Sequence, residues 1–418
     1  MRALFLAVLV VGMVYFLAIR RGIDFYTLAF AASGIYFVPG VVGYDLPGTP
    51  IQPKTYAIFL LVLASLLVAG VLRPPRPPHA LREPHGHAPT LAAGLAVAVV
   101  SYVLVANGFA ALFLAKGDQG VAAAAYVIWR VAASFAVIFG VLARRRGVLL
   151  CGLFGLLLMF LASDRTAVAM VVAALGVGLL GRRRVSPLRA TGLWAIPLAL
   201  ALVVVWGGKL MQIAIRQSFH HGNVSDAVGL LADPAALRLV TTSAEPFIIQ
   251  AHLNQAVRRD MYVGPRHLVG VAYQLWPAPS MFGHPTNEFN NILQDELFPQ
   301  ARKNTLAYNF WAEGLVSGGW LLLFLYVVIY AAGIEAANAV ARSPNLAHRG
   351  IALLMGAYWA VYIHRNSAAS IVAYEKQVLF LGLLILVGSA LLPAPVRRPA
   401  RGGAAVGPAP PPPLAGAA

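Results

Sequence analysis

The stretch from Thr305 to Tyr330, TLAYNFWAEGLVSGGWLLLFLYVVIY, decides the fold class. It begins with polar and aromatic residues and continues as a long apolar run in which only Glu313 is charged. An apolar run of about 20 residues is long enough to cross the hydrocarbon core of a bilayer as an α-helix. The stretch therefore predicts a transmembrane helix that enters the membrane from a polar segment.

The rest of the chain has the same character. Of its 418 residues, 59% are hydrophobic and only 11% are charged, whereas a soluble domain carries about 25% charged residues. The apolar runs are unbroken rather than alternating, so they favour helices over membrane strands. We predict an all-α, polytopic transmembrane bundle of about eleven spans. The candidate spans are residues 3–19, 25–44, 55–72, 90–115, 121–142, 148–162, 166–181, 188–206, 306–332, 350–363 and 376–392.

Basic residues alternate between the short connections. Every second connection is rich in arginine, and the connections between them hold little beyond Lys54, Lys116, Arg165, Arg365 and Lys376. The positive-inside rule places the arginine-rich set in the cytoplasm. The arginine-rich set is Arg20, Arg21, Arg73, Arg76, Arg82, Arg144, Arg145, Arg146, Arg182, Arg183, Arg184, Arg189, Arg342, Arg349, Arg397, Arg398 and Arg401. The N-terminus then lies outside and the C-terminus inside.

The same pattern divides the chain into four parts. Residues 1–206 form an N-terminal bundle of about eight spans, with a proline-rich cytoplasmic linker at 73–89. Residues 207–305 form one large extracytoplasmic loop that contains short helices. Residues 306–392 hold the C-terminal transmembrane helices. Residues 393–418 have low complexity, and we expect them to be a disordered cytoplasmic tail.

The large loop has its own organisation. Residues 243–259, SAEPFIIQAHLNQAVRR, predict a helix with apolar residues on one face. Residues 225–232 and 234–240 predict two shorter helices. The tract at 262–282, YVGPRHLVGVAYQLWPAPSMF, is rich in aromatic residues, glycine and proline, which indicates a segment at the membrane interface. Residues 284–300 are polar and acidic.

Some classes of function are not supported by the sequence. It contains no P-loop, no dinucleotide-binding glycine motif and no zinc-protease or hydrolase motif. Cys151 is the only cysteine, so the chain has neither an internal disulfide nor a cysteine-based metal site. We predict no metal and no cofactor. The net charge of +17 lies largely in the topogenic connections, so we do not expect nucleic acid as a partner.

Two tracts carry a resemblance to a known family. One is YVGPRHLVGVAYQLWP from Tyr262, and the other is NFWAEGLVSGGWLL from Asn309. Together with the multi-span layout and one large outer loop in the second half, they make the chain resemble the Wzy-type polysaccharide polymerases. These are integral membrane enzymes that polymerise the repeat units of O-antigens and exopolysaccharides. The layout covers most of the chain, and the two tracts lie within a segment of about 60 residues, 262–322.

The resemblance implies a location and a chemistry. The protein would be a membrane glycosyltransferase of the bacterial inner membrane, with its large loop in the periplasm. Its partners would be an undecaprenyl-pyrophosphate-linked oligosaccharide, membrane lipids and a chain-length regulator. Cations would neutralise the departing pyrophosphate, and a carboxylate or histidine would help the acceptor hydroxyl. No nucleotide is needed, because the pyrophosphate already activates the donor.

Arginines near the outer membrane boundary are candidates for binding pyrophosphate. Arg165 lies in a very short connection between two apolar runs, where a charge is costly unless it is paired or functional. It could equally form a cap pair with Asp164 at a helix end. Arg258, Arg259 and Arg266 gather around a Gly-Pro turn. These three could instead contact lipid phosphates.

Acid–base candidates lie at the end of the loop. His284, Asn287 and Glu288 are close in sequence and could bind a sugar or move a proton, although polar loops often contain such residues. The related ligases that attach finished glycans to a lipid core also use a histidine in this loop, so a ligase remains an alternative. Glu313 is a carboxylate inside an apolar run, which indicates function unless nearby basic residues neutralise it.

The candidate site residues fall into two classes. The catalytic candidates are Arg165, Arg266, His284, Glu288 and Glu313. The substrate-binding candidates are Arg216, Arg258, Arg259, Asn287, Tyr308 and Arg365. Arg130, inside a predicted span, and His364 to Asn366, at the end of another, either line a cavity or extend to the interface.

Two other classes of function compete with an enzyme. A flippase or transporter of the same glycolipids would more often show repeated halves, and none stands out here. A scaffolding membrane protein would not explain the arginines near the outer boundary.

Overall fold

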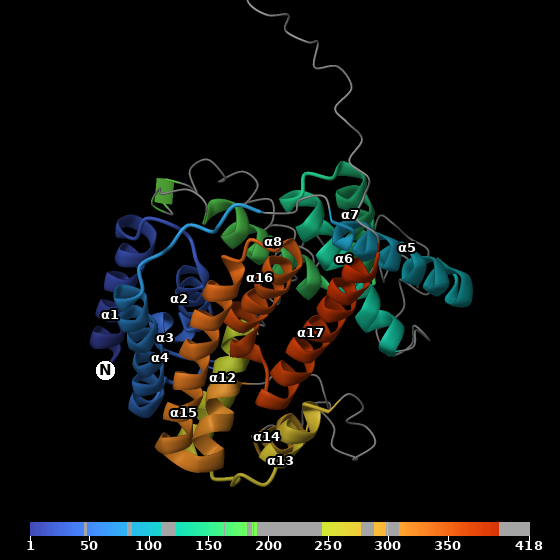
Figure 1. The fold of residues 1–418 in the computed structure, drawn as a ribbon. Coiled ribbons are helices and arrows are strands. Elements are labelled where there is room, and N and C mark those ends of the chain that lie inside the picture. The colour runs from blue at the N-terminus through green and yellow to red at the C-terminus, as the bar shows by residue number, and fades with distance from the viewer. Residues whose placement is uncertain are drawn as a thin grey trace, which may run out of the picture.

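The computed structural model describes residues 1–45, 48–81, 86–109, 123–162, 164–181, 186, 188–189, 245–276, 288–297, 299 and 309–392 (Figure 1). Every regular element in these ranges is a helix, which confirms the all-α prediction. Seven helices are long and apolar enough to cross a membrane. They are α1 (Arg2–Val14) with η1 (Tyr15–Ile19), α4 (Pro53–Leu72), α5 (Ala88–Asn107), α6 (Ala123–Leu142), α15 (Phe310–Ala341), α16 (Leu346–Val361) with η4 (Tyr362–Arg365), and α17 (Ala368–Leu391).

Three shorter apolar helices accompany them: α2 (Phe25–Tyr36), α7 (Arg146–Leu161) and α8 (Arg165–Leu180). Several predicted segments lie outside the described residues. They are the span at 188–206 beyond residue 189, the loop helices at 225–232 and 234–240, and the tail. The predicted span 25–44 is broken, because α2 ends at Tyr36 and a short helix, α3 (Val38–Val42), follows. Pro39 in α3 lacks an N–H and crowds the preceding turn, so a single helix cannot continue through it.

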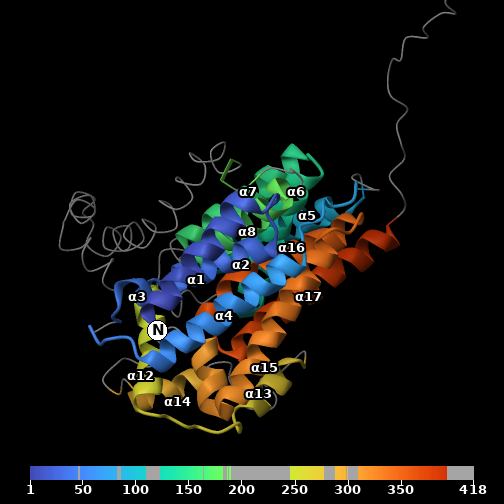
Figure 2. The same cartoon turned by 90° about the vertical axis from the view of Figure 1, so that its left-hand side faces the viewer.

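Helix α16 forms the centre of the bundle. It contacts α15, α17, α8, α2 and α6, and residues from each of its turns are buried. Helices α1, α2 and α4 lie on one side of it, and α5, α6 and α7 lie on the other (Figure 1, Figure 2). The protein is therefore built around a helix that ends in the predicted candidate Arg365.

Helix α15 consists of two helical segments that meet at a break. Gly318 and Gly319 have non-helical backbone angles, and Gly319 has a φ of 64°, a conformation that glycine adopts without strain. The backbone N–H of Val263 donates to the carbonyl of Val316, just before the break, over 2.8 Å. The tract that starts at Tyr262 thus supplies a partner for a carbonyl that the break leaves outside the helical ladder.

The predicted helix at 243–259 is confirmed as α12 (Glu245–Arg258), and it lies inside the protein. It contacts α2, α3, α4 and α15. Asn254, which is fully buried, accepts hydrogen bonds from the backbone N–H of Gln52 (2.8 Å) and the hydroxyl of Thr55 (3.1 Å). Its amide donates to the carboxylate of Asp45 over 2.7 Å. These bonds fasten α12 to the connection between α3 and α4.

The other described helices of the large loop lie at one end of the bundle. Helix α13 (Leu268–Gln274) contacts α17, and α14 (Glu288–Leu297) contacts α12. Figure 1 shows both below the end of α17 and beside the lower end of α15. We call this end the loop end, and the opposite end the linker end, because residues 73–81 of the proline-rich linker cross it (Figure 1).

Hydrogen bonds attach the linker to the helical bundle at two points. Arg20 donates to the carbonyl of Arg73 over 2.8 Å. The backbone N–H of His79 donates to the carbonyl of Arg342 (3.1 Å), and Arg349 donates to the carbonyl of His79 (2.5 Å). The described part of the linker therefore ties α1 and η1 to α15 and α16.

Close packing of α6 against α7 depends on glycine and gives a first prediction. A Cβ on Gly140 would lie 2.6 Å from the backbone nitrogen of Leu149, whereas a Cβ on Gly147 would meet nothing within 4 Å. Gly140→Ala should lower the free energy of unfolding by about 1–3 kcal/mol. Gly147→Ala, the matched control, should leave it unchanged or raise it by up to about 1 kcal/mol. Thermal unfolding in detergent measures both, and equal effects would contradict the packing.

Buried His252 of α12 gives a second prediction. Burial lowers its pKa from 6.5 to about 4, so between these values the unfolded chain binds more protons than the folded protein. Stability then falls as pH is lowered, by roughly 2 kcal/mol between pH 7.5 and pH 5. His252→Gln should flatten this slope in thermal unfolding, and His348→Gln, at an exposed position, should not. An unchanged slope in His252→Gln would refute the assignment.

Candidate functional site

Arg365 connects the central helix to the large loop. It lies in η4, directly after α16, and its guanidinium forms an ion pair with the carboxylate of Glu245 over 2.5 Å. Glu245 is the first residue of α12. The guanidinium also lies over the ring of Tyr362, 4.8 Å from its centre. Both charged side chains stay partly exposed, with exposed fractions of 29% and 38%, so the pair is open to a ligand.

Arg165 lies beside this pair. Its neighbour Asp164 is the N-cap of α8 and accepts from the backbone N–H groups of Thr166 and Ala167. This confirms the helix-capping role of Asp164. Arg165 itself is half-buried and interacts electrostatically with Glu245 and Arg365. Two of the residues that the sequence singled out, 200 positions apart, therefore both interact electrostatically with the Glu245 carboxylate.

A third arginine lies deeper in the bundle. Arg130 of α6 is 5% exposed, and its guanidinium donates to the side-chain carbonyl of Gln377 over 2.5 Å. It lies 3.9 Å from the carboxylate of Asp164 and over the ring of Tyr374. The hydroxyl of Tyr126 donates to the same Asp164 carboxylate over 3.2 Å. Asp164 thus caps α8 and holds Arg130 at the same time.

Tyrosines join these arginines into one group. The ring centres of Tyr362 and Tyr374 are 5.4 Å apart, and those of Tyr358 and Tyr374 are 5.6 Å apart. Tyr362 is therefore in contact with Arg365 on one side and with the ring that covers Arg130 on the other. We call the group the arginine cluster. It consists of Arg130, Arg165, Arg365, Asp164, Glu245, Tyr358, Tyr362 and Tyr374.

The cluster has unused hydrogen-bonding capacity. The Nε atoms of Arg130 and Arg365 are buried and have no hydrogen-bond partner among the described residues. Glu375 of α17 interacts electrostatically with Tyr358, and both of its carboxylate oxygens are also without a partner there. Guanidinium forks bind phosphate oxygens in pairs, and a carboxylate accepts protons. The group can therefore hold a phosphate or pyrophosphate and accept a proton.

Glu313 lies in a separate buried group at the loop end. It is fully buried, and one carboxylate oxygen accepts from the backbone N–H of Ala368, at the start of α17, over 2.6 Å. The other oxygen is 3.3 Å from Nε2 of His267. The His267 ring also stacks on Phe289, with ring centres 4.9 Å apart. Glu313 thus links α15 to α13 and α17, and its described partner is a histidine rather than a neighbouring lysine or arginine.

His364 has a structural position despite lying next to Arg365. It is fully buried, and Nδ1 accepts from the indole N–H of Trp311 over 3.1 Å. Nε2 lies 3.1 Å from the hydroxyl of Ser33, which donates to the carbonyl of Ala29. Nε2 therefore carries the proton and donates to Ser33. With both ring nitrogens used, His364 holds η4, and with it Arg365, in place.

The remaining predicted residues whose side chains the structure describes are not brought into the cluster. Arg258, Arg259 and Arg266 are exposed, and Arg259 donates to the carbonyl of Glu296 over 2.7 Å. Arg258 is at the opposite end of α12 from Glu245, which separates the two by about 20 Å along the helix. Glu288 begins α14, and its side chain lies outside the described residues. Arg216, His284, Asn287 and Tyr308 also lie outside them.

Sequence reasoning missed residues in the cluster and beside it. Glu245 lay in the predicted loop helix, and nothing in the sequence pointed to its pairing with Arg365. Glu375 lies one residue before the predicted span 376–392, and so outside the predicted apolar segment. Helix α17 in fact begins at Ala368, which puts Glu375 inside the apolar segment, where a carboxylate indicates function. Placing that boundary correctly would have found it.

Comparison with known proteins gives no match to a family model, to a curated protein or to a solved structure.

The buried group around Glu313 gives a third prediction. Glu313→Ala removes the acceptor for the Ala368 N–H, and a buried donor without a partner costs about 1–3 kcal/mol. Glu313→Gln keeps an acceptor oxygen and should be less destabilising. Glu296→Gln, which changes an exposed carboxylate, should leave thermal unfolding in detergent unchanged. If Glu313→Ala melts like Glu296→Gln, the carboxylate does not hold α17.

Proposed function

We propose that this protein is a membrane glycosyltransferase that polymerises undecaprenyl-pyrophosphate-linked oligosaccharide repeat units. The reaction would take place at the outer face of the bacterial inner membrane, with the loop end in the periplasm. The observation that carries the proposal is the arginine cluster. Three arginines from separate elements gather beside apolar helices, and the Nε groups of two of them, Arg130 and Arg365, have no hydrogen-bond partner among the described residues.

The chemistry of the donor fits this group. A polyprenyl pyrophosphate has an anionic headgroup next to a long apolar chain, so its site needs cations at the edge of a lipid-facing bundle. Arg165 and Arg365 are partly exposed, whereas Arg130 is buried. In the reaction a hydroxyl oxygen of the acceptor sugar attacks the anomeric carbon of the donor. The bond from that carbon to the pyrophosphate oxygen breaks, and the lipid pyrophosphate leaves with the electron pair, stabilised by the guanidiniums.

The acceptor hydroxyl must lose its proton as the new bond forms. Glu375, once ionised, is a candidate base, because its carboxyl group lies near the same tyrosines and has no other hydrogen-bond partner among the described residues. The predicted base candidates in the loop, His284 and Glu288, remain alternatives to it. The ion pair of Glu245 with Arg365 would connect acceptor binding by the loop to the donor site.

Substitution of the cluster arginines gives a fourth prediction. Arg165→Gln and Arg365→Gln should each reduce polymerisation at least tenfold, since each removes a charge that stabilises the leaving group by about 1.4 kcal/mol or more. Arg266→Ala should also shorten the polymer. Lys54→Gln changes an exposed cation near the loop helices and should have no effect. The measurement is glycan chain length on a deletion strain carrying each variant, with membrane levels checked.

The outcomes separate the competing functions. Normal chain lengths in both Arg165→Gln and Arg365→Gln would exclude the cluster as the site. Single repeat units that accumulate on the cytoplasmic side would indicate a flippase. Full-length polymer that stays on its undecaprenyl carrier would indicate a ligase. Elongation of purified lipid-linked repeat units by the reconstituted protein, without nucleotide, would establish the polymerase.

A further inference from the structure

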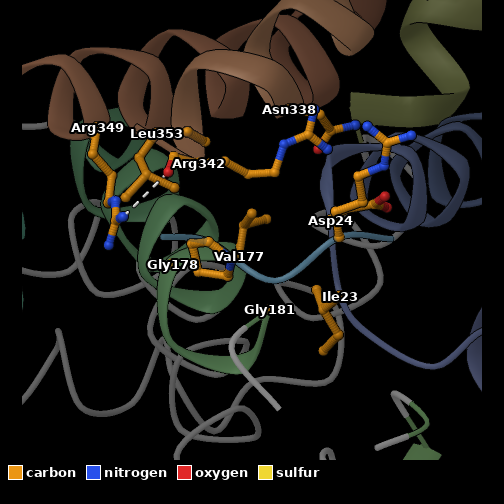
Figure 3. Close-up of a pocket in the computed structure, with 12 residues that line it drawn as sticks. Ile23, Asp24, Val177, Gly178, Gly181, Asn338, Arg342, Arg349 and Leu353 are labelled. Carbon is orange, nitrogen blue, oxygen red and sulfur yellow. Dashed lines mark hydrogen bonds between the residues drawn. The ribbon is translucent and has the colours of Figure 1, made fainter. Parts of the chain in front are cut away.

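A second polar region lies at the linker end, and the proposed reaction does not use it. A pocket of about 40 Å³, open to water-sized molecules, is enclosed by the linker, the start of α2 and the linker-side ends of α8, α15 and α16 (Figure 3). A single water needs roughly 10–15 Å³ of such space. The pocket therefore suits a compact group such as a phosphate and is too small for a sugar chain. Its lining residues are Ile23, Asp24, Arg76, Pro78, Val177, Gly178, Gly181, Asn338, Ala341, Arg342, Arg349 and Leu353.

The pocket carries an excess of positive charge. Asp24 is the only acidic residue among its described lining residues, and that carboxylate already pairs with Arg20 over 2.5 Å and caps α2. Arg349 is buried and donates to backbone carbonyls that include those of Ser343 and His79. Arg76 and Arg342 also line the pocket, and among the described residues neither guanidinium has an ion-pair partner within 4 Å. Figure 3 shows the side chain of Arg342 extending toward Asn338.

Asn338 makes the pocket specific. It is 7% exposed, and its side-chain oxygen accepts from the backbone N–H of Phe25 over 2.9 Å, which fixes the orientation of the amide. Its Nδ2 then faces the other way and has no hydrogen-bond partner among the described residues. A buried N–H₂ group without a partner is costly. The partial negative charge at a helix C-terminus stabilises nearby arginine side chains even without a ligand. That stabilisation does not explain why Nδ2 of Asn338 is buried without a partner beside them.

We propose that this pocket binds a phosphate group, with Asn338 Nδ2 and the guanidiniums of Arg76 and Arg342 as its donors. The occupant is either the headgroup phosphate of a phospholipid or free phosphate, since both present the same oxygens. Basic pockets between transmembrane helices are suited to lipid headgroups. The bound phosphate joins the linker, through Arg76, to α15, through Asn338 and Arg342. It therefore stabilises the linker end without taking part in glycosyl transfer.

The test uses the full-length protein, purified in mild detergent and stripped of lipid. Binding is measured by native mass spectrometry and by the shift in thermal midpoint. The probes are phosphatidylglycerol, dioleoylglycerol, which has acyl chains but no phosphate, and inorganic phosphate. We expect phosphatidylglycerol to bind and raise the midpoint by several degrees, and dioleoylglycerol to do neither. Equal effects of the two lipids would overturn the proposal.

Three variants locate the binding. Arg342→Gln removes one charge, and Asn338→Asp keeps the oxygen that accepts from Phe25 but replaces the donor with a negative charge. Each should weaken phosphatidylglycerol binding at least tenfold. Arg21→Gln loses the same charge at an exposed position of the linker end and should bind like the wild type. Should Asn338→Asp fail to fold, Arg342→Gln alone decides, and wild-type affinity in that variant refutes the site.

Inorganic phosphate distinguishes the two sources. Displacement of the lipid by millimolar phosphate, with the same stabilisation, identifies free phosphate as the occupant and confirms the phosphate site. A lipid that resists displacement identifies the headgroup. Normal polymerisation by Arg342→Gln is expected in either case, so the result is independent of the proposed enzyme activity.

Discussion

Lipid provides no hydrogen bonds, so each polar group within this bundle needs a partner from the chain itself. This constraint explains why the buried polar residues occur in pairs that join distant segments. Asn254 binds the connection between α3 and α4, and Arg349 binds the linker. His364 has a donor on one ring nitrogen and an acceptor on the other. Each pair fixes the relative position of the two segments that it joins. Apolar packing alone specifies that position poorly.

The insertion of α12 has the largest consequence for the site. An amphipathic helix of an extramembrane loop could lie on the lipid surface. Here both faces of α12 have partners, because its apolar residues pack between α2, α4 and α15 and Asn254 satisfies a polar connection. As a result Glu245 is held at Arg365, beside the end of the central helix. The loop therefore contributes directly to the arginine cluster.

The sequence predicted what depends on local pattern. Unbroken apolar runs identified the helices because a span needs about 20 apolar residues in succession, and Asp164 was recognised as a possible cap because its partners are its own neighbours. Pairings across the fold were not predictable. Nothing near Glu245 indicates Arg365, which lies 120 positions away, and nothing near Glu313 indicates His267, its partner in the structure. Such contacts depend on helix rotation and depth, which one sequence does not encode locally.

The buried polar groups of this protein are of two kinds, those with hydrogen-bond partners in the chain and those without. Asp164, Asn254 and His364 are fully used within the protein, so their burial is explained by folding. At Glu375 and at Nδ2 of Asn338, burial comes without any compensating bond among the described residues. Such groups lower stability, and their presence is explained if a ligand completes them. One lies beside the arginine cluster and one at the linker end, so the two sites can bind different phosphate-bearing molecules independently.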